Sequence, residues 1–306
     1  MINESTNIWK KFRTLIISTC ILIIYLLILF PVEINPVLVI AMALLISIFG
    51  IPHGALDYKL LEAVWSKKSL PLIVFLYAIL GIGTVLIWVS NPTFMLAIFL
   101  IMSSYHFGGD YPLGLTARFL AGFLLLGLPV FFYPTEVHRI FTIITNNNSS
   151  ESVIWGLQVI NFISIAYFSC LLLLRKIHGE QIIEFILLGF LAWVSTPLIY
   201  FTIYFCLFHS VKHFSEMGNI LGQESLAKLF LLATPISLIT FSIGLISFFY
   251  LHQSFDTTQN DAIIKVVFIG LSALTTPHML LVEHIRLKND NNATSSSSEN
   301  EFRKNV

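Results

Sequence analysis

The chain has 306 residues, of which 56% are hydrophobic and only 11% are charged, and its mean hydropathy is +0.84. This composition excludes an ordinary soluble enzyme and indicates an integral membrane protein. The net charge is zero, with 17 basic and 17 acidic residues, so no strong positive field is available to attract nucleic acid. The three cysteines, Cys20, Cys170 and Cys206, lie in apolar segments without ligand-like spacing, which argues against disulfides and a zinc–thiolate site.

Apolar segments long enough to approach a membrane span recur along nearly the whole chain. They cover residues 13–30, 37–51, 70–89, 93–107, 115–133, 153–174, 182–195, 197–213, 226–250 and 262–284. The pattern predicts an all-α polytopic membrane protein with about ten transmembrane helices. Because Pro197 disfavours helix in the preceding residue, the seventh and eighth segments could instead form one long kinked helix, which would give nine. We expect a single membrane domain over residues 1–288, followed by a polar, disordered tail over 289–306.

The distribution of basic residues predicts the orientation of these helices. Cytoplasmic loops carry an excess of Lys and Arg. With ten spans and an internal N-terminus, every Lys and Arg except Arg139 and Lys265 falls on the inner side, whereas nine spans would place Lys212 and Lys228 outside. We therefore predict a multi-pass protein of the cell (inner) membrane, with both termini in the cytoplasm.

Five of the nine histidines lie inside or at the ends of apolar segments, where an ionisable side chain requires a functional reason. They occur in four polar islands, which read IPHGALDY (51–58), YHFGGDY (105–111), FHSVKHF (208–214) and TTPHMLLVE (275–283). The predicted topology places His53, His106, His209, His213 and His278 near the cytoplasmic side of the membrane. Imidazoles gathered at one depth from separate helices indicate a metal site.

The third island contains two histidines at helical spacing. His209 and His213 are four residues apart, so both rings can point at one atom. Alternatively, this pair could bond to lipid headgroups or to neighbouring helices. Asp57 and Asp110 each follow the histidine of their own island by four residues and could orient its ring, although either carboxylate could also be a surface cap.

The donor type narrows the choice of metal. Neutral imidazole suits zinc, copper, iron and nickel, while the absence of thiolates disfavours structural zinc. Four imidazoles on an octahedral ferrous ion would leave two positions open, so iron fits oxygen chemistry best. Apolar side chains near the islands suit a long lipid or polyene substrate, although most could simply be core or lipid contacts. Candidates for lining the substrate are Tyr105, Phe107, Phe208 and Met279, with Phe94, Phe99, Phe205, Phe214 and Trp193 nearby.

Together the four islands resemble the Brp/Blh-type β-carotene dioxygenases of bacteria and archaea that accompany retinal-binding rhodopsins. The resemblance rests on PHGALD, YHFGGD, HSVKH and TPHMLLVE and spans most of the chain. It implies a membrane enzyme that uses Fe²⁺ and O₂ to split the central 15,15′ double bond of β-carotene into two all-trans-retinal, with a functional link to a rhodopsin. It also implies iron ligands at His53, His106, His209 and His213, with His278 near the site as an orienting residue or alternate ligand.

The physical properties of β-carotene agree with a membrane enzyme. The molecule is about as long as the hydrocarbon core is thick and dissolves only in the bilayer, so an embedded enzyme can take it laterally between helices. Three other interpretations remain open. They are a membrane di-iron hydroxylase or desaturase, which usually needs more histidines, a metal or proton transporter, and a retinal photoreceptor with Lys265 as its Schiff-base lysine.

Overall fold

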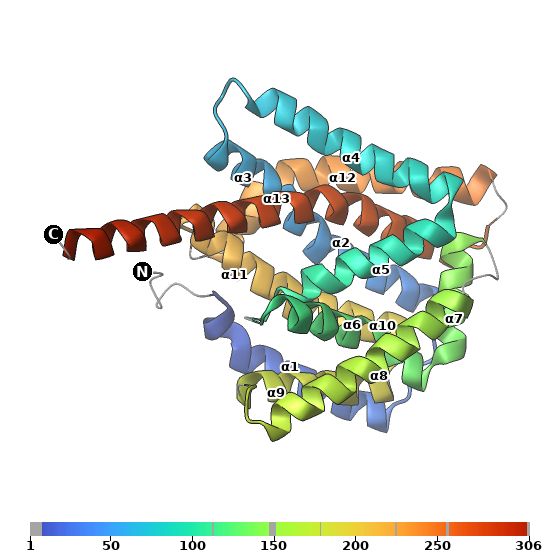
Figure 1. Ribbon diagram of the computed structural model, residues 1–306. Coiled ribbons are helices and arrows are strands. Elements are labelled where there is room, and N and C mark those ends of the chain that lie inside the picture. The colour runs from blue at the N-terminus through green and yellow to red at the C-terminus, as the bar shows by residue number, and fades with distance from the viewer. Residues whose placement is uncertain are drawn as a thin grey trace.

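The described residues of the computed structural model are 8–111, 113–146, 151–177, 179–223, 225–254 and 257–304, with side chains described as far as Arg286. They contain helices and no strand, which confirms the all-α class (Figure 1). The helices are α1 (Ile8–Leu29), α2 (Pro36–Ala55), α3 (Asp57–Val64), α4 (Leu70–Ser90), α5 (Pro92–Gly108), α6 (Leu115–Phe132), α7 (Pro134–Thr145), α8 (Glu151–Leu173), α9 (Gly179–Val194), α10 (Pro197–Ile203), the π-helix η3 (Tyr204–His209), α11 (Ser210–Leu221), α12 (Leu226–Ser254) and α13 (Gln259–Lys304).

Within the described residues, seven helical stretches are long and apolar enough to cross a membrane, which confirms a polytopic membrane protein. They are Ile8–Leu29, Pro36–Val64, Leu70–Ser90, Leu115–Phe132, Glu151–Leu173, Leu226–Ser254 and Gln259–Arg286. The count of about ten is not confirmed, because the other expected spans fall on shorter or interrupted helices. Of these, α5 has 17 residues, α9 has 16, and the third is divided among α10, η3 and α11.

The expected alternative of one kinked helix over residues 182–213 is wrong. Helix α9 ends at Val194 and α10 begins at Pro197, with Thr196 extended between them at φ −63° and ψ 158°. Proline in the first turn of a helix lacks the amide hydrogen that would otherwise be unpaired there. The residue before it is driven out of the helical region, so the chain breaks at this point.

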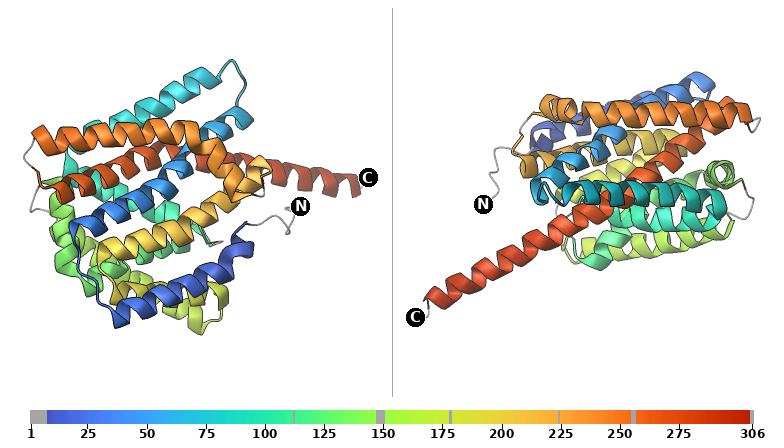
Figure 2. Two further views of the ribbon diagram at one scale, coloured as in Figure 1. Left: turned by 180° about the vertical axis from the view of Figure 1, so that it is seen from behind. Right: turned by 90° about the horizontal axis from the view of Figure 1, so that it is seen from above.

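Helix α13 lies within the bundle and joins its parts (Figures 1 and 2). It packs against α2, α4 and α12 and also contacts α5 and α7. The start of α1 and the end of α13 lie at the same end of the bundle in all views, and α13 projects beyond the bundle there. Asn305 and Val306 lie outside the described residues. The division into a membrane domain over 1–288 and a disordered tail over 289–306 stays a prediction.

The π-helix η3 changes the direction in which the third island faces. The backbone amide of Ser210 donates to the carbonyl of Phe205, five residues earlier, which adds one residue to the turn. One extra residue rotates the following side chains by about 100° around the helix axis. Tyr200 consequently faces α6, where its hydroxyl donates to the carbonyl of Leu125 at 2.8 Å, while His209 faces the other histidines.

Two glycines allow α5 and α6 to lie almost in backbone contact. A Cβ at Gly122 would lie 1.7 Å from the carbonyl oxygen of Ser104, and one at Gly108 would lie 1.8 Å from that of Arg118. Small residues at helix interfaces permit this close approach. It strengthens van der Waals packing, which matters inside a membrane because the hydrophobic effect does not drive helices together there. The contact fixes the end of α5 that carries His106.

Replacing Gly122 with Ala should lower the stability of the detergent-extracted protein by about 1 to 3 kcal/mol, because the new methyl group forces the two helices apart. The apparent melting temperature measures this loss. Gly156→Ala in α8 is the matched control, since a Cβ there has nothing within 4 Å and alanine favours helix by up to about 1 kcal/mol. Equal melting temperatures for the two variants would contradict the packing argument.

Candidate metal centre

The five histidines of the polar islands form one buried cluster. They come from α2, α5, η3, α11 and α13, and His53 lies at the centre. The centroid of its ring is 3.5 Å from that of His213, 4.8 Å from His278, 5.0 Å from His209 and 5.7 Å from His106. None of the five is more than 8% exposed. The structure therefore brings together every histidine that the sequence placed at or near the site.

The ring nitrogens of the cluster point at one another. The Nε2 atoms of His106 and His209 are 3.1 Å apart, and the potential ligand atoms of His53, His106 and His278 all lie within 4.8 Å of one another. Three buried ring nitrogens have no hydrogen-bond partner, namely His53 Nδ1, His213 Nε2 and His278 Nε2. A buried nitrogen without a partner costs free energy, and a shared metal ion would remove that cost.

These residues fit a divalent transition metal. Metal–imidazole bonds of about 2.1 Å place neighbouring nitrogens about 3.0 to 3.4 Å apart in octahedral or tetrahedral geometry, and the pair at His106 and His209 meets this requirement. The cluster of histidines contains no thiolate, because Cys20, Cys170 and Cys206 lie elsewhere, and it is consistent with iron, copper, nickel or zinc. His278 belongs to the closest group of three, although the sequence could place it only near the site.

Asp57 orients a different histidine from the one expected. The spacing allowed it to orient His53, four residues before it, or to act as a surface cap, but its carboxylate accepts from Nδ1 of His278 at 2.8 and 2.9 Å. The hydroxyl of Tyr77 in α4 donates to the same carboxylate at 2.6 Å. Helix α2 ends at Ala55, so Asp57 opens a new helix and faces α13 instead of its own helix. A bonded Nδ1–H leaves Nε2 of His278 free to bind a metal.

Asp110 shows the same exchange of partners. It was predicted to orient His106, but it accepts from Nδ1 of His209 at 2.9 Å. Helix α5 ends at Gly108, so Asp110 lies in the following turn, where helical spacing no longer applies. The carboxylate therefore reaches η3. Asp57 and Asp110 thus each orient a histidine of another island. The bond of Asp57 links α3 to α13, and that of Asp110 links the end of α5 to η3.

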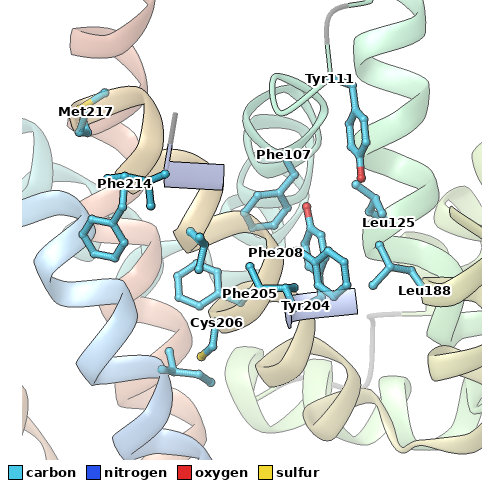
Figure 3. Close-up of a cluster of buried hydrophobic side chains, with 14 of the residues drawn as sticks. Phe107, Tyr111, Leu125, Leu188, Tyr204, Phe205, Cys206, Phe208, Phe214 and Met217 are labelled. Atoms are coloured by element: carbon cyan, nitrogen blue, oxygen red, sulfur yellow. The ribbon is translucent and has the colours of Figure 1, made fainter. Parts of the chain in front are cut away.

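Only some of the candidate substrate-lining residues lie at the histidine cluster. Figure 3 shows Phe107, Phe205 and Phe208 among the buried hydrophobic side chains. Phe107 and Phe205 line a cavity of about 20 Å³ together with four of the histidines. Phe208 instead packs on Trp9 of α1, with 6.3 Å between the ring centroids. Met279 is half-buried but does not line this cavity. Adjacent residues are separated by about 100° around a helix, so proximity in sequence does not decide which neighbour of a histidine faces the site.

Tyr105 lies in a polar network and not in the cavity. Its hydroxyl donates to Glu283 at 2.6 Å, and the Arg118 guanidinium stacks 3.6 Å from the centre of its ring. Arg118 also donates to Glu283 at 3.4 Å, and Arg286 pairs with Glu216 at 3.0 Å. The network ties α5, α6, α11 and α13 together beside the histidines. The proposal that Tyr105 guides a substrate therefore loses its geometric basis.

A second polar group lies where α1, α9 and α11 meet. Lys212 pairs with Glu184 at 2.5 Å and lies over the ring of Tyr111, whose hydroxyl donates to Glu184 at 3.2 Å. Burial raises the pKa of Tyr111 well above its ordinary value, and the negative charge of Glu184 adds to this rise. Tyr111 therefore remains a neutral hydrogen-bond donor. The contact holds α11, which carries His213, against α9.

Sequence reasoning missed several residues at the site, among them Tyr77, Thr275 and Gly50. Tyr77 holds Asp57, Thr275 lines the cavity, and Gly50 leaves room for a ring, since a Cβ there would lie 2.9 Å from Phe205. Thr275 stands in the fourth island and could have been found there. Tyr77 and Gly50 lie in apolar segments without a pattern that marks them, so only the packing of helices identifies them.

Comparison with known proteins identifies the family. Residues 44–286, which include all five histidines, match the family model described as β-carotene 15,15′-dioxygenase. The chain belongs to this family. It is 34% identical over 260 residues to a β-carotene 15,15′-dioxygenase of an uncultured marine bacterium 66A03, which covers 80% of this chain and 92% of the relative.

A more distant relative comes from an archaeon. The chain is 23% identical over 281 residues to a probable β-carotene 15,15′-dioxygenase Blh of Halobacterium salinarum, covering 77% of this chain and 80% of that protein. No solved structure gives a significant match. The resemblance to the Brp/Blh-type β-carotene dioxygenases, which the four islands indicated, is thereby confirmed.

Replacing Asp57 with Asn should weaken the binding of Fe²⁺, used here as the probe metal, about 10- to 100-fold, because the carboxylate that fixes His278 loses its charge. Competition with a chelator measures the affinity. Glu62→Gln removes a carboxylate from the same helix, where it is exposed and pairs with Lys59 at 2.7 Å, and should leave the affinity unchanged. Equal iron affinity in both variants would show that Asp57 has no role in holding the metal site.

Proposed function

We propose that this chain cleaves the central 15,15′ double bond of β-carotene with Fe²⁺ and O₂, giving two molecules of all-trans-retinal. The observation that carries the proposal is a cluster of converging, buried imidazoles within apolar helices, in a family whose relatives are named for this reaction. We assign the iron to His53, His106, His209 and His213. His278 serves as a further or alternate ligand, because its free Nε2 faces the same point.

The chain's own residues have limited tasks in this reaction. Bound iron supplies the activation of dioxygen, which the protein side chains cannot provide. One O₂ is consumed, one carbon–carbon double bond breaks, and each aldehyde receives one oxygen atom, so no net proton transfer and no other reductant are needed. Asp57 and Asp110 hold the Nδ1 protons of His278 and His209, which keeps the Nε2 atoms directed into the site. Phe107 and Phe205 exclude water from the cavity.

The family and the geometry favour this reaction over the alternatives. Among the described residues, the histidines of the islands form one cluster. This cluster offers fewer metal ligands than a di-iron hydroxylase or desaturase usually uses. Lys265, the residue a photoreceptor would need, donates to Asn146 at 2.6 Å and lies thirteen residues before His278 on α13, about 20 Å away along the helix axis. A metal or proton transporter has no comparable support from the relatives.

We further propose ten spans in the cell inner membrane, both termini in the cytoplasm, and supply of the retinal to a rhodopsin. The arrangement at one end of the bundle supports the orientation. The amide of Trp9 in α1 donates to Ser215 of α11 at 3.1 Å, and Lys212 lies over the Trp9 ring. The start of α1, Lys212 of α11 and the end of α13 thus share a side, as expected if this side carries the cytoplasmic Lys and Arg residues.

A reporter that is active only outside the cytoplasm should give no signal when it is fused after Val306. The same reporter placed after Thr257, between α12 and α13, should give a strong signal, because α13 crosses the membrane once between the two positions. Reporter activity relative to the amount of fusion protein is the measurement. The reverse pattern would contradict the proposed orientation.

Expression in a bacterial host that makes β-carotene should remove the orange colour and yield retinal, which chromatography detects. His53→Ala, His106→Ala, His209→Ala and His213→Ala should each reduce retinal formation below detection, because the loss of one ligand lowers iron occupancy and misaligns the rest. His252→Ala is the control, since this side chain is exposed and bonds to the carbonyl of Thr257. Iron analysis of the purified proteins must accompany the assay. Wild-type iron content and turnover in His209→Ala would refute the ligand assignment.

A further inference from the structure

A large apolar cavity lies between α2, α12 and α13, beside the histidine cluster. Its volume is about 310 Å³, and aliphatic and aromatic side chains form most of its wall. The few polar side chains that line it are uncharged and belong to Ser47, Thr240 and Gln259. We call it the α2–α12–α13 cavity. Such a lining favours a long hydrocarbon ligand over any polar molecule.

This cavity connects the lipid-facing surface with the proposed iron site. At its inner end Leu271 and Leu274 also line the small cavity formed by the histidines. At its outer side Ile40, Leu44 and Leu245 are 36 to 45% exposed on the surface that the bilayer would cover. A hydrophobic molecule dissolved in the membrane can therefore reach the histidines without crossing water.

The cavity is long enough to hold half of a β-carotene molecule. Its lining extends along α2 from Ile40 to Ile51, a rise of about 16 Å, and along α13 from Gln259 to Leu274, a rise of about 22 Å. A molecule about as long as the hydrocarbon core, about 30 Å, has half-lengths of about 15 Å. If the central bond lies at the histidines, one half of the molecule would fill the cavity and the ring at its end would lie near Ile40.

A second apolar cavity, between α5, α6, α7 and α10, also reaches the site through Phe107. It is smaller, at about 80 Å³. None of the large hydrophobic side chains that line it is exposed on the surface of the described residues. It therefore offers no comparable entry from the membrane, so the α2–α12–α13 cavity is the better candidate for admitting the substrate.

We propose that the α2–α12–α13 cavity binds one ring-bearing half of the carotenoid, and that its length positions the central double bond at the histidines. This inference rests on the proposed function and adds the location of the substrate. Leu271 and Leu274 contact the polyene where it leaves the cavity for the iron site. The distance from this point to the far end of the cavity, near Ile40, determines which bond is cleaved.

Two glycines in opposite walls provide a test of the cavity. A Cβ at Gly270 of α13 has nothing within 4 Å, and one at Gly244 of α12 has only Val266 at 3.9 Å. A larger side chain at either position would occupy the cavity without striking the backbone of a neighbouring helix. Gly83 of α4 also has nothing within 4 Å but does not line the cavity. It provides the matched control.

The variants are Gly270→Leu, Gly244→Leu and Gly83→Leu, each purified with its iron and assayed with β-carotene. The first two should lower kcat/KM about tenfold or more, because the new side chain displaces part of the substrate, while iron content stays at the wild-type level. Gly83→Leu should match the wild type. A second measurement is the absorbance of carotenoid retained by metal-depleted protein from a β-carotene-producing host, which should fall in the first two variants alone.

The outcomes separate this inference from the proposed function. Wild-type turnover and carotenoid retention in both Gly270→Leu and Gly244→Leu would overturn the cavity assignment and leave the proposed reaction standing. Loss of retained carotenoid in these two variants would support the cavity even if turnover were too slow to measure. A wild-type protein that neither cleaves nor retains β-carotene would overturn both proposals.

Discussion

Burial of several imidazoles at one point is the constraint on which the rest of the structure depends. Polar nitrogens inside an apolar bundle are costly unless each has a partner, and like-charged rings at centroid distances of 3.5 to 5.7 Å would repel one another if protonated. The rings therefore need donors and acceptors supplied by the protein, and a bound metal ion would satisfy the lone pairs that remain. His53 Nδ1, His213 Nε2 and His278 Nε2 are such atoms.

The surrounding helices are arranged to hold these rings in place. Asp57 and Asp110 fix the outer nitrogens of His278 and His209, and Tyr77 fixes Asp57 in turn. Each of these bonds joins two different helices, so the orientation of a ring depends on how the bundle packs. The glycine contact between α5 and α6 and the π turn at η3 determine where the ring-bearing segments lie. The precision of the site thus comes from helix packing together with hydrogen bonds.

The apolar surroundings of the site suit the proposed lipid-soluble substrate. A substrate soluble only in the bilayer must enter from the side, and the α2–α12–α13 cavity opens there. The ion pairs of Arg118, Glu283, Arg286 and Glu216 tie the helix ends beside the histidines. The apolar cavity is thus separate from this polar network, because none of these four residues lines it.

Local chemistry in the sequence determined the fold class, the membrane character and the candidate histidines, because hydropathy and buried ionisable residues are properties of short segments. The four islands also identified the family. The partners of Asp57 and Asp110 could not be predicted, since each carboxylate follows a helix end and bonds to a distant segment. The different positions of Phe107, Phe208 and Met279 could not be predicted either, because the direction of a side chain depends on helix rotation and on the π turn at η3. Only the tertiary structure decided these contacts, as they join residues up to 221 positions apart.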